Sequence, residues 1–306
     1  LCPTMNSDAP HMRNLHSHTY RCKHASGDAV EYVSHALKTG VDTYGISDHT
    51  PLPGDRFNSH RMAMSELDDY HRAIKEAQHA FPGISVLAGL ECEDFDDCRN
   101  FYQDEILGRR NFDYLIGAGH FTPLQGFWED SYFGMTSAAK LRAYGDHLCA
   151  MMESPLYAFI AHPDVFGLSS GHWNENLKAC SLDILAAAEV NETPLEINGG
   201  GFRKLAQKSG KETHPGFPLR QFWEAASDYR ITVVCNSDAH HPADAMASIE
   251  ECIHFAEELG LTTAELNFLG DRRQALMNFA DRIGTDEAKA LATSLVQSEQ
   301  YGTPLT

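Results

Sequence analysis

Histidines recur along this sequence at spacings that suit metal binding. The chain of 306 residues contains 17 histidines, and the first group is His16-Ser17-His18, with His24 six residues further on. Side chains on a strand alternate between its two faces, so His16 and His18 would share one face and could bind a single ion. Histidine is also the side chain that transition metals bind most often. One such pair is weak evidence, because paired histidines also occur without a metal.

Residues that bind metals follow six other short apolar runs as well. In chain order these are Asp48-His49, Glu91 with Glu93, His120, His162-Pro163-Asp164, Glu196-Ile197-Asn198 and Asp238-Ala239-His240. Seven runs that all end in His, Asp or Glu favour a polynuclear metal site over coincidence. Mixed imidazole and carboxylate ligands suit Zn, Mn or Fe(II) better than Ca or Mg. We therefore predict a centre for divalent transition metals.

The elements that must hold these residues are strands alternating with helices. The apolar runs predict strands at Leu15–His18, Thr43–Ser47, Ile84–Leu90, Tyr114–Ala118, Phe159–Ala161, Leu195–Ile197 and Ile231–Val234. Amphipathic spacing predicts helices at Ala29–Thr39, Ser65–Ala80, Ser137–Glu153, Lys178–Val190, Leu219–Asp228 and Ile249–Leu259. This alternation predicts a parallel α/β sheet, and seven strands suggest closure into a barrel. The carboxyl ends of parallel strands carry the active site in such folds, and the candidate ligands lie there.

Composition limits the possible partners. The chain has 24 Lys and Arg against 43 Asp and Glu, a formal charge of −19, which repels nucleic acid and anionic lipid. No apolar run reaches 18 residues, so we predict no membrane span. The eight cysteines form no CxxC pair, which argues against a disulfide framework and favours a reducing cytoplasm. We expect a polar leader at 1–12 and a single barrel domain at 13–306, with a helical tail from about Thr262.

Longer motifs surround the candidate ligands. They are His16 to His24, Ser47-Asp48-His49, Gly89-Leu90-Glu91, Gly117 to His120, Ala161-His162-Pro163 and Ser237 to His240. In this order and spacing they resemble the motifs of the polymerase-and-histidinol-phosphatase (PHP) family of metallophosphoesterases. Within that family the chain is most similar to the histidinol-phosphatases, through Asp48-His49-Thr50-Pro51, Asp113 to Phe121 and Glu196 to Lys204.

The resemblance implies a distorted (β/α)7 TIM-like barrel that holds two or three divalent ions (Zn, Mn or Fe). Carried over by position, the first ion would take His16, His18, Glu91 and Asp238. The second would share Glu91 and add His120 and His162, and the third would take His24, His49 and His240. Two choices remain open: Cys22 could replace His24 as a ligand, and Glu93 could face the substrate or support a ligand.

The expected reaction is hydrolysis of a small phosphate ester by in-line attack of metal-bound hydroxide. Asp48 is the predicted general acid, or alternatively a carboxylate that orients a histidine. Arg203 is the predicted phosphate clamp, because a guanidinium binds phosphate through two parallel hydrogen bonds. The residues assigned to the substrate beside it are Arg61, Glu93, Asn198 and Lys204.

L-histidinol phosphate is the substrate that the resemblance favours, which would place the protein in histidine biosynthesis. One alternative is a PHP-type nucleotide or nucleic-acid phosphoesterase, such as a nucleoside bisphosphate phosphatase or a 3′-exonuclease. The negative charge and the lack of a basic cluster disfavour a long nucleic acid as its substrate. The other alternative, a catalytically silent metal-binding module, should lack several ligands, whereas the full set is present here. We therefore expect a small phosphorylated metabolite as the partner, and no membrane.

Overall fold

The computed structural model describes residues 13–170, 172–207 and 216–263. The chain divides into two units, Leu1–Ala264 and Glu265–Thr306, and every described residue belongs to the first. The predicted leader at 1–12 lies outside the described residues, as does the predicted helical tail beyond residue 263, while Thr262–Thr263, where the tail was expected to begin, form a strand. Within the described part, no helix has the length and apolar character needed to span a membrane, and the seven cysteines found there form no disulfide.

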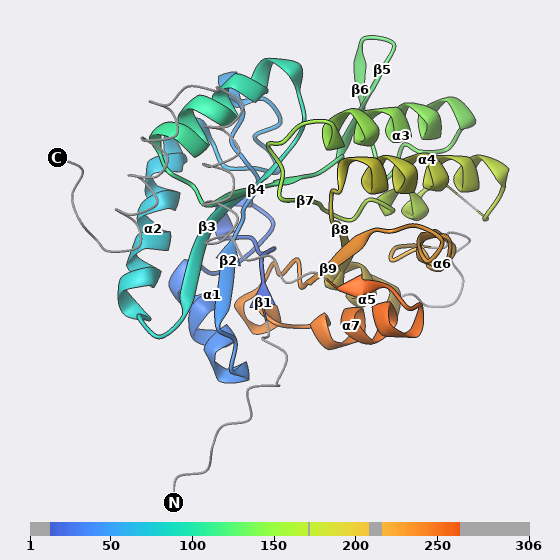
Figure 1. The fold of residues 1–306 in the computed structure, drawn as a ribbon. Coiled ribbons are helices and arrows are strands. Elements are labelled where there is room, and N and C mark those ends of the chain that lie inside the picture. The colour runs from blue at the N-terminus through green and yellow to red at the C-terminus, as the bar shows by residue number, and fades with distance from the viewer. Residues whose placement is uncertain (1–12, 171, 208–215, 264–306) are drawn as a thin grey trace, which may run out of the picture. The chain divides into compact units, whose positions relative to one another are not determined.

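Eight parallel strands form one curved sheet (Figure 1), in the order β1-β2-β3-β4-β7-β8-β9-β10. Their bounds are β1 Arg13–Asn14, β2 Thr43–Ile46, β3 Ser85–Cys92, β4 Tyr114–Gly117, β7 Phe159–Ile160, β8 Leu195–Asn198, β9 Thr232–Asn236 and β10 Thr262–Thr263. Beyond the ends of β1 and β9, Ser17 and Ala239 form a parallel bridge, and His18 N donates to Ala239 O at 2.9 Å. The curved sheet thus brings the segments after β1 and β9 together at its carboxyl end.

The predicted parallel α/β fold is confirmed, with one strand more than the seven expected. The additional strand, β10, consists of two exposed threonines and carries no apolar signal. At the other edge, the predicted bounds Leu15–His18 are wrong, because β1 is only two residues long and ends at Asn14. The bridge at Ser17 continues the pairing of this segment, so His16 and His18 still extend from a strand end.

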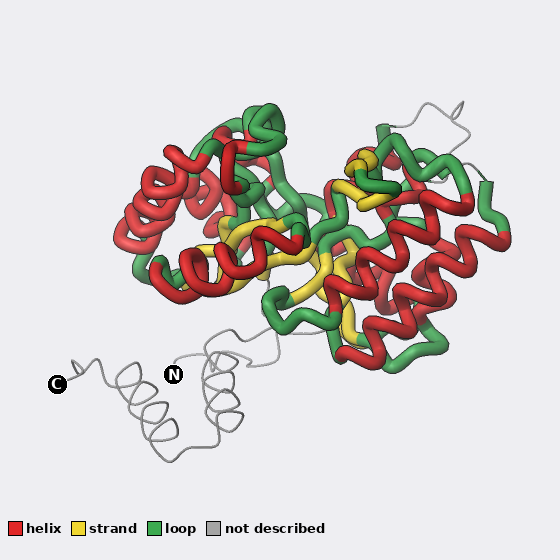
Figure 2. The backbone as a smooth tube through the Cα atoms, turned by 90° about the horizontal axis from the view of Figure 1, so that it is seen from above, coloured by secondary structure: helices red, strands yellow, loops and turns green. Residues whose placement is uncertain are grey.

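Seven α-helices are found among the described residues, and in Figure 2 the strands lie between two groups of helices. They are α1 Ala29–Ala36, α2 Leu67–Ala80, α3 Ala138–Met152, α4 Glu175–Asn191, α5 Gly199–Ala206, α6 Arg220–Ala226 and α7 Ile249–Glu258. Six correspond to predicted helices. The exception is α5, which begins with three glycines and was not predicted because glycine is a poor helix former. A π-helix at Phe101–Arg109 was also not predicted.

An antiparallel hairpin stands apart from the parallel sheet. It consists of β5 (Phe121–Leu124) and β6 (Phe127–Asp130), and it projects beyond α3 in Figure 1. Its two-residue turn places Gln125 at φ 52° and Gly126 at φ 83°. Positive φ at both central positions suits a tight hairpin, because that turn matches the twist of the two strands.

Tyr114 packs tightly against β2 and β3. A Cβ atom on Gly45 would lie 2.0 Å from the hydroxyl of Tyr114, and one on Gly89 would lie 2.3 Å from its ring. The hydroxyl of Tyr114 donates to Leu15 O at 2.6 Å. Only glycine leaves room for this ring, so both glycines let β2 and β3 pack around it. The strand that carries Glu91 is therefore held from inside the sheet.

Candidate metal centre

The carboxyl ends of the strands surround a cavity of about 560 Å³. The predicted ligands that line it are His18, His24, His49, Glu91, His120, His162, Asp238 and His240. The ninth predicted ligand, His16, lies fully buried beneath them, with its Nε2 3.2 Å from Nε2 of His18. The curvature of the sheet therefore gathers the nine residues into one place.

Glu91 is the common neighbour of the histidines. Its side chain is buried at the end of β3, and both carboxylate oxygens face imidazole nitrogens. Oε1 lies 3.1 Å from His162 Nε2, 3.3 Å from His120 Nε2 and 3.4 Å from His16 Nε2, and Oε2 lies 2.8 Å from His49 Nδ1. A carboxylate in this position can bridge two ions, which is the role that the resemblance implied.

Three groups of predicted ligands place their donor atoms within 4.8 Å of one another. They are His16 with His18 and Glu91, His49 with Glu91 and His120, and His24 with His49 and His240. A fourth group joins Cys22 to His18 and His240. The prediction grouped His120 with His162 rather than with His49, and both histidines lie within 3.3 Å of Glu91 Oε1.

Several buried polar atoms of the centre make no hydrogen bond of suitable geometry with the described residues, although two of them, Glu91 Oε2 and His49 Nδ1, lie 2.8 Å apart. They are Glu91 Oε2, Asp238 Oδ1, His49 Nδ1 and His162 Nδ1. A buried polar atom without a partner is costly, and a buried charge is more so. Divalent cations would satisfy these atoms, and a set of imidazoles and carboxylates is the donor set of Zn, Mn and Fe(II). The residues therefore fit transition-metal ions.

The electrostatics of the centre favour the protonation states that metals need at Glu91 and His240, whereas nearby carboxylates overcome burial and raise the pKa of His18 to about 9 and that of His120 to about 10. Burial alone raises the pKa of Glu91, but the charges of His120, His16 and His49 outweigh it and hold that pKa well below its usual value. Burial, with the charge of His18, lowers the pKa of His240 to about 3. An ionised carboxylate and a neutral imidazole are the forms that bind a cation, because a bound proton would compete with the ion.

Two of the predicted ligands have strained backbones. His162 has φ 29° and Asp238 has φ 50°, in a region that residues with a Cβ rarely occupy. Such conformations cost on the order of 1–3 kcal/mol each and persist only where the surroundings enforce them. They occur here just after β7 and β9, where the chain turns to direct both side chains into the cavity.

Glu196 holds the buried side of the centre, although we did not predict it as a site residue. Its Oε1 lies 2.8 Å from His16 Nδ1 and accepts from Asn236 Nδ2 at 3.0 Å. Its Oε2 accepts from Asn198 Nδ2 at 2.8 Å and from His162 N at 3.1 Å. A carboxylate on Nδ1 fixes the ring so that Nε2 faces the metal. The position of Glu196 at the end of a predicted strand is the sequence feature that could have identified it.

Asp48 supports a ligand and does not reach the cavity. Its side chain is fully buried and does not line the 560 Å³ cavity. Oδ1 lies 3.4 Å from His18 Nδ1 and accepts from His49 N, while Oδ2 accepts from Thr19 N. This placement does not suit the predicted general acid, because the carboxyl has no path to a leaving group. It favours the alternative of an orienting carboxylate, with His18 as its partner.

Glu93 and Arg61 form a buried pair behind His120. Glu93 Oε1 lies 2.7 Å from His120 Nδ1 and accepts from Arg61 Nη2 at 3.0 Å. Arg61 Nη1 donates to Thr50 O, and Arg61 also lines the cavity, whereas Glu93 does not. Glu93 is therefore placed to orient His120, and not to touch a substrate as we predicted.

Arg203, the predicted phosphate clamp, lines the cavity, and its guanidinium also donates to carbonyl groups of the chain itself. Its Nη2 donates to the carbonyl oxygens of Ser237 at 2.9 Å and Asp238 at 3.0 Å, and its Nη1 donates to Ala247 O at 3.1 Å. It thus ties α5 to the strained turn that carries Asp238. Asn198 is also structural: it is buried outside the cavity lining, and it donates to Glu196 and to Asp238 Oδ2 at 3.2 Å.

Three basic residues were predicted to contact the substrate: Arg61, Arg203 and Lys204. Of these, Lys204 lines the cavity and has no described hydrogen-bond or ion-pair partner. It is exposed and lines the cavity, with Nζ 5.2 Å from the ring of Tyr132 and 5.2 Å from that of Phe217. Other lining residues had no recognisable spacing in the sequence, and these are His60, Phe121, Asp130, Tyr132, Phe133, Gln207 and Asp244.

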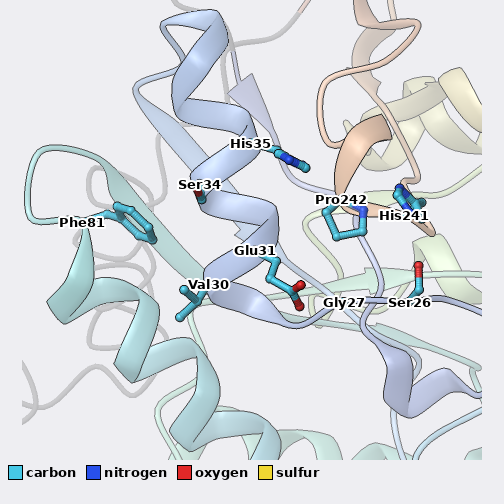
Figure 3. Close-up of a pocket in the computed structure, with 9 residues that line it drawn as sticks. All are labelled: Ser26, Gly27, Val30, Glu31, Ser34, His35, Phe81, His241 and Pro242. Atoms are coloured by element: carbon cyan, nitrogen blue, oxygen red, sulfur yellow. The ribbon is translucent and has the colours of Figure 1, made fainter.

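A second cavity, of about 430 Å³, is bordered by α1 and by the segments that follow His24 and His240 in the chain (Figure 3). It is lined by Ser26, Gly27, Val30, Glu31, Ser34, His35, Phe81, His241 and Pro242. Ser26 N donates to His240 O at 2.9 Å, which joins the two loops. None of the predicted ligands lines this cavity, so it is separate from the metal centre.

Comparison with known proteins agrees with this geometry. The PHP domain model matches residues 14–200. A Deinococcus radiodurans protein named "Probable histidinol-phosphatase" is 27% identical over 252 residues, which cover 80% of this chain and 92% of that protein. "Probable phosphatase YcdX" from Escherichia coli K12 is 24% identical over 271 residues, which cover 89% of this chain and 94% of that protein.

A solved structure shares the fold. The histidinol phosphate phosphatase of Lactococcus lactis, solved in complex with zinc, L-histidinol and phosphate, superposes with a TM-score of 0.63 at 16% identity. The match covers 83% of this chain and 95% of that one. At this identity the likeness establishes the fold alone. Because the domain model spans more than half of the chain and the ligand types meet at the strand ends, the protein belongs to the PHP domain family and is a metal-dependent phosphoesterase.

Proposed function

We propose that the protein hydrolyses L-histidinol phosphate to L-histidinol and phosphate. The observation that carries this proposal is the cavity of about 560 Å³, which is lined by members of all three ligand groups. A cavity of this size suits a small metabolite, at the lower part of the range for ligand sites. The names of the relatives from Deinococcus radiodurans and Lactococcus lactis support the choice of ester.

Two or three divalent ions would be held by the groups around Glu91 and by His24, His49 and His240. When bound, Zn, Mn or Fe ions supply positive charge for the phosphoryl oxygens and make water a nucleophile at neutral pH. The chain's own contribution is orientation. Asp48, Glu93 and Glu196 fix the rings of His18, His120 and His16, so each Nε2 is aimed before the substrate arrives.

We further propose that Lys204 contacts the phosphate. Both terminal nitrogens of Arg203 donate to backbone carbonyls, and those of Arg61 donate to Thr50 O and Glu93. Lys204 is the cation of the three whose charged group is not held by a described oxygen. Its flexible stem would let the ammonium reach a phosphate oxygen in the cavity.

The test is phosphate release from a panel of esters by protein loaded with Mn, Zn or Fe(II). The panel contains histidinol phosphate, nucleoside monophosphates, nucleoside bisphosphates and short oligonucleotides. We expect the highest kcat/KM for histidinol phosphate, and no activity in the Glu91→Gln variant, which serves as the control for a contaminating phosphatase. A higher kcat/KM for a nucleotide or oligonucleotide would overturn the proposed substrate.

A further inference from the structure

His24 differs from the other predicted ligands in what holds it. The other eight lie in β-strands or within a few residues after them, whereas His24 follows a 3-10 turn at Tyr20–Cys22. It is also the exposed member of the nine. Its Nε2 nevertheless lies 3.1 Å from that of His240, in the group that these two residues form with His49. Something other than the sheet must therefore fix the position of His24.

We propose that Arg21 is a positioning residue for this third ligand group, and that it sets the affinity of the group for an ion. Arg21 would act by anchoring the turn that carries His24. It does not line the cavity, so it would touch neither the ion nor the substrate. The inference rests on the proposed metal centre and adds to it a residue that controls one group separately from the others.

The guanidinium of Arg21 is buried between the first turns of two helices. The residue is 2% exposed. Its Nη1 and Nη2 donate to Oδ1 and Oδ2 of Asp28 at 2.8 and 3.0 Å, and its Nε donates to Asp69 Oδ2 at 3.1 Å. Asp28 is the N-cap of α1, and Asp69 lies in the first turn of α2. Because paired hydrogen bonds between a guanidinium and a carboxylate fix geometry as well as charge, they tie the turn to both helices.

The turn transmits this anchor to His24. Arg21 N donates to Thr19 Oγ1 at 3.4 Å, and Cys22 N donates to Thr19 O at 3.2 Å, so the turn is closed around Arg21. The carbonyl oxygen of Cys22 lies 2.8 Å from His24 Nδ1. A backbone oxygen at Nδ1 directs the other ring nitrogen, Nε2, toward an ion. Movement of the turn would therefore displace the acceptor that orients His24.

A further contact of Arg21 leads toward another ligand. Its Nη1 lies 3.4 Å from Thr19 Oγ1, and Thr19 donates to Asp48 Oδ2 through both its backbone nitrogen and its hydroxyl. Asp48 orients His18 of the first group. Neither bond to Asp48 involves the guanidinium, so both can persist without Arg21. An effect that runs through Asp48 is the alternative that the experiment must separate from an effect through His24.

A double-mutant cycle with His24 makes this separation, because coupling appears only between residues that act through each other. The variants of the full-length protein are Arg21→Met, His24→Ala and the two combined. Arg21→Lys keeps the charge but lacks the planar fork. Arg61→Met is the matched control, since Arg61 is 3% exposed and pairs with Glu93 behind His120. Elemental analysis after dialysis against graded concentrations of free Mn measures the ions bound.

We expect His24→Ala to bind one Mn ion fewer than the unmodified protein. Arg21→Met should weaken the binding of that same ion about 10–100-fold, the range for residues that orient a ligand, and Arg21→Lys should weaken it less. In the His24→Ala background, Arg21→Met should leave the remaining ions unchanged. Arg61→Met should weaken an ion in both backgrounds. If Arg21→Met does not fold, Arg21→Lys carries the same comparison.

Two results would overturn the inference. One is equal weakening by Arg21→Met with and without His24, because Arg21 would then act through Asp48 or through the fold as a whole. The other is equal Mn binding by the unmodified protein and His24→Ala. Neither result decides the proposed function, which phosphate release tests separately. If the cycle shows coupling but histidinol phosphate is not cleaved, the inference stands and the proposed substrate is wrong.

Discussion

Two carboxylates on the same strand illustrate how position decides a residue's role. Glu91 faces the imidazoles of the centre, whereas Glu93, two residues later, faces His120 Nδ1 and Arg61. We expect Glu91→Gln to lose metal from two groups at once, because it removes the shared charge. Glu93→Gln should keep the ions but bind them about 10–100-fold more weakly in the group that contains His120.

Elemental analysis after dialysis against a metal buffer measures both effects. Since Glu91 and Glu93 have similar burial, the two variants control for each other. Our assignment of Glu91 as the bridge is wrong if Glu93→Gln empties the centre and Glu91→Gln does not.

The buried position of Asp48 leads to a second prediction about a single residue. Asp48→Asn should lower the rates of an alkyl phosphate and of p-nitrophenyl phosphate by the same factor, because the buried side chain only orients His18. A proton donor would behave differently, since an alkoxide leaving group needs a proton and p-nitrophenolate does not. Steady-state kinetics on both esters decide between the roles. A loss confined to the alkyl ester would restore Asp48 as the general acid.

At the scale of elements, α5 and the turn after β9 depend on one guanidinium. We expect Arg203→Met to destabilise the protein by about 1–3 kcal/mol, because the backbone carbonyls of Ser237, Asp238 and Ala247 lose charged donors. The variant should also bind less metal, since Asp238 would relax from its positive φ.

Lys204→Met is the matched control, as the next residue on the same helix. It should raise KM for the phosphate ester and leave the melting temperature within about 1 °C, because surface substitutions rarely change stability. Thermal denaturation and steady-state kinetics of the two variants measure this contrast. Equal melting temperatures for Arg203→Met and the unmodified protein would contradict the structural role of Arg203.

Helices and strands could be predicted where the spacing of apolar residues was regular. The buried stripe of α2, with Leu67, Tyr70, Ile74 and Ala77, lies in the core as its spacing indicates. The β5–β6 hairpin was not predictable in the same way, because Gln125-Gly126 is a weak turn signal and β5 contains a proline. The roles of Asp48 and Arg203 depend on which atoms face them across the fold, and spacing along the chain does not contain that information.

At the scale of the whole molecule, the metal centre links stability to metal supply. Because the ions would bind the folded chain, a chelator should lower the melting temperature, and Mn or Zn should restore it. At a free metal concentration 100 times the dissociation constant, each ion contributes about 2.7 kcal/mol. For a unit of this size, that corresponds to a shift of about 5–10 °C. Calorimetric scans with and without chelator check this, and identical scans would contradict the presence of metal in the folded protein.

The bridge between Ser17 and Ala239 has a consequence for synthesis of the protein. His24 and His240, whose Nε2 atoms lie 3.1 Å apart, are separated by 216 positions in the chain. A ribosome therefore releases His16, His18 and His24 long before it adds Asp238 and His240. During that interval the early histidines face a chain without its last two ligands. The finished metal centre is thus a property that the chain can acquire only after Asp238 and His240 have been added.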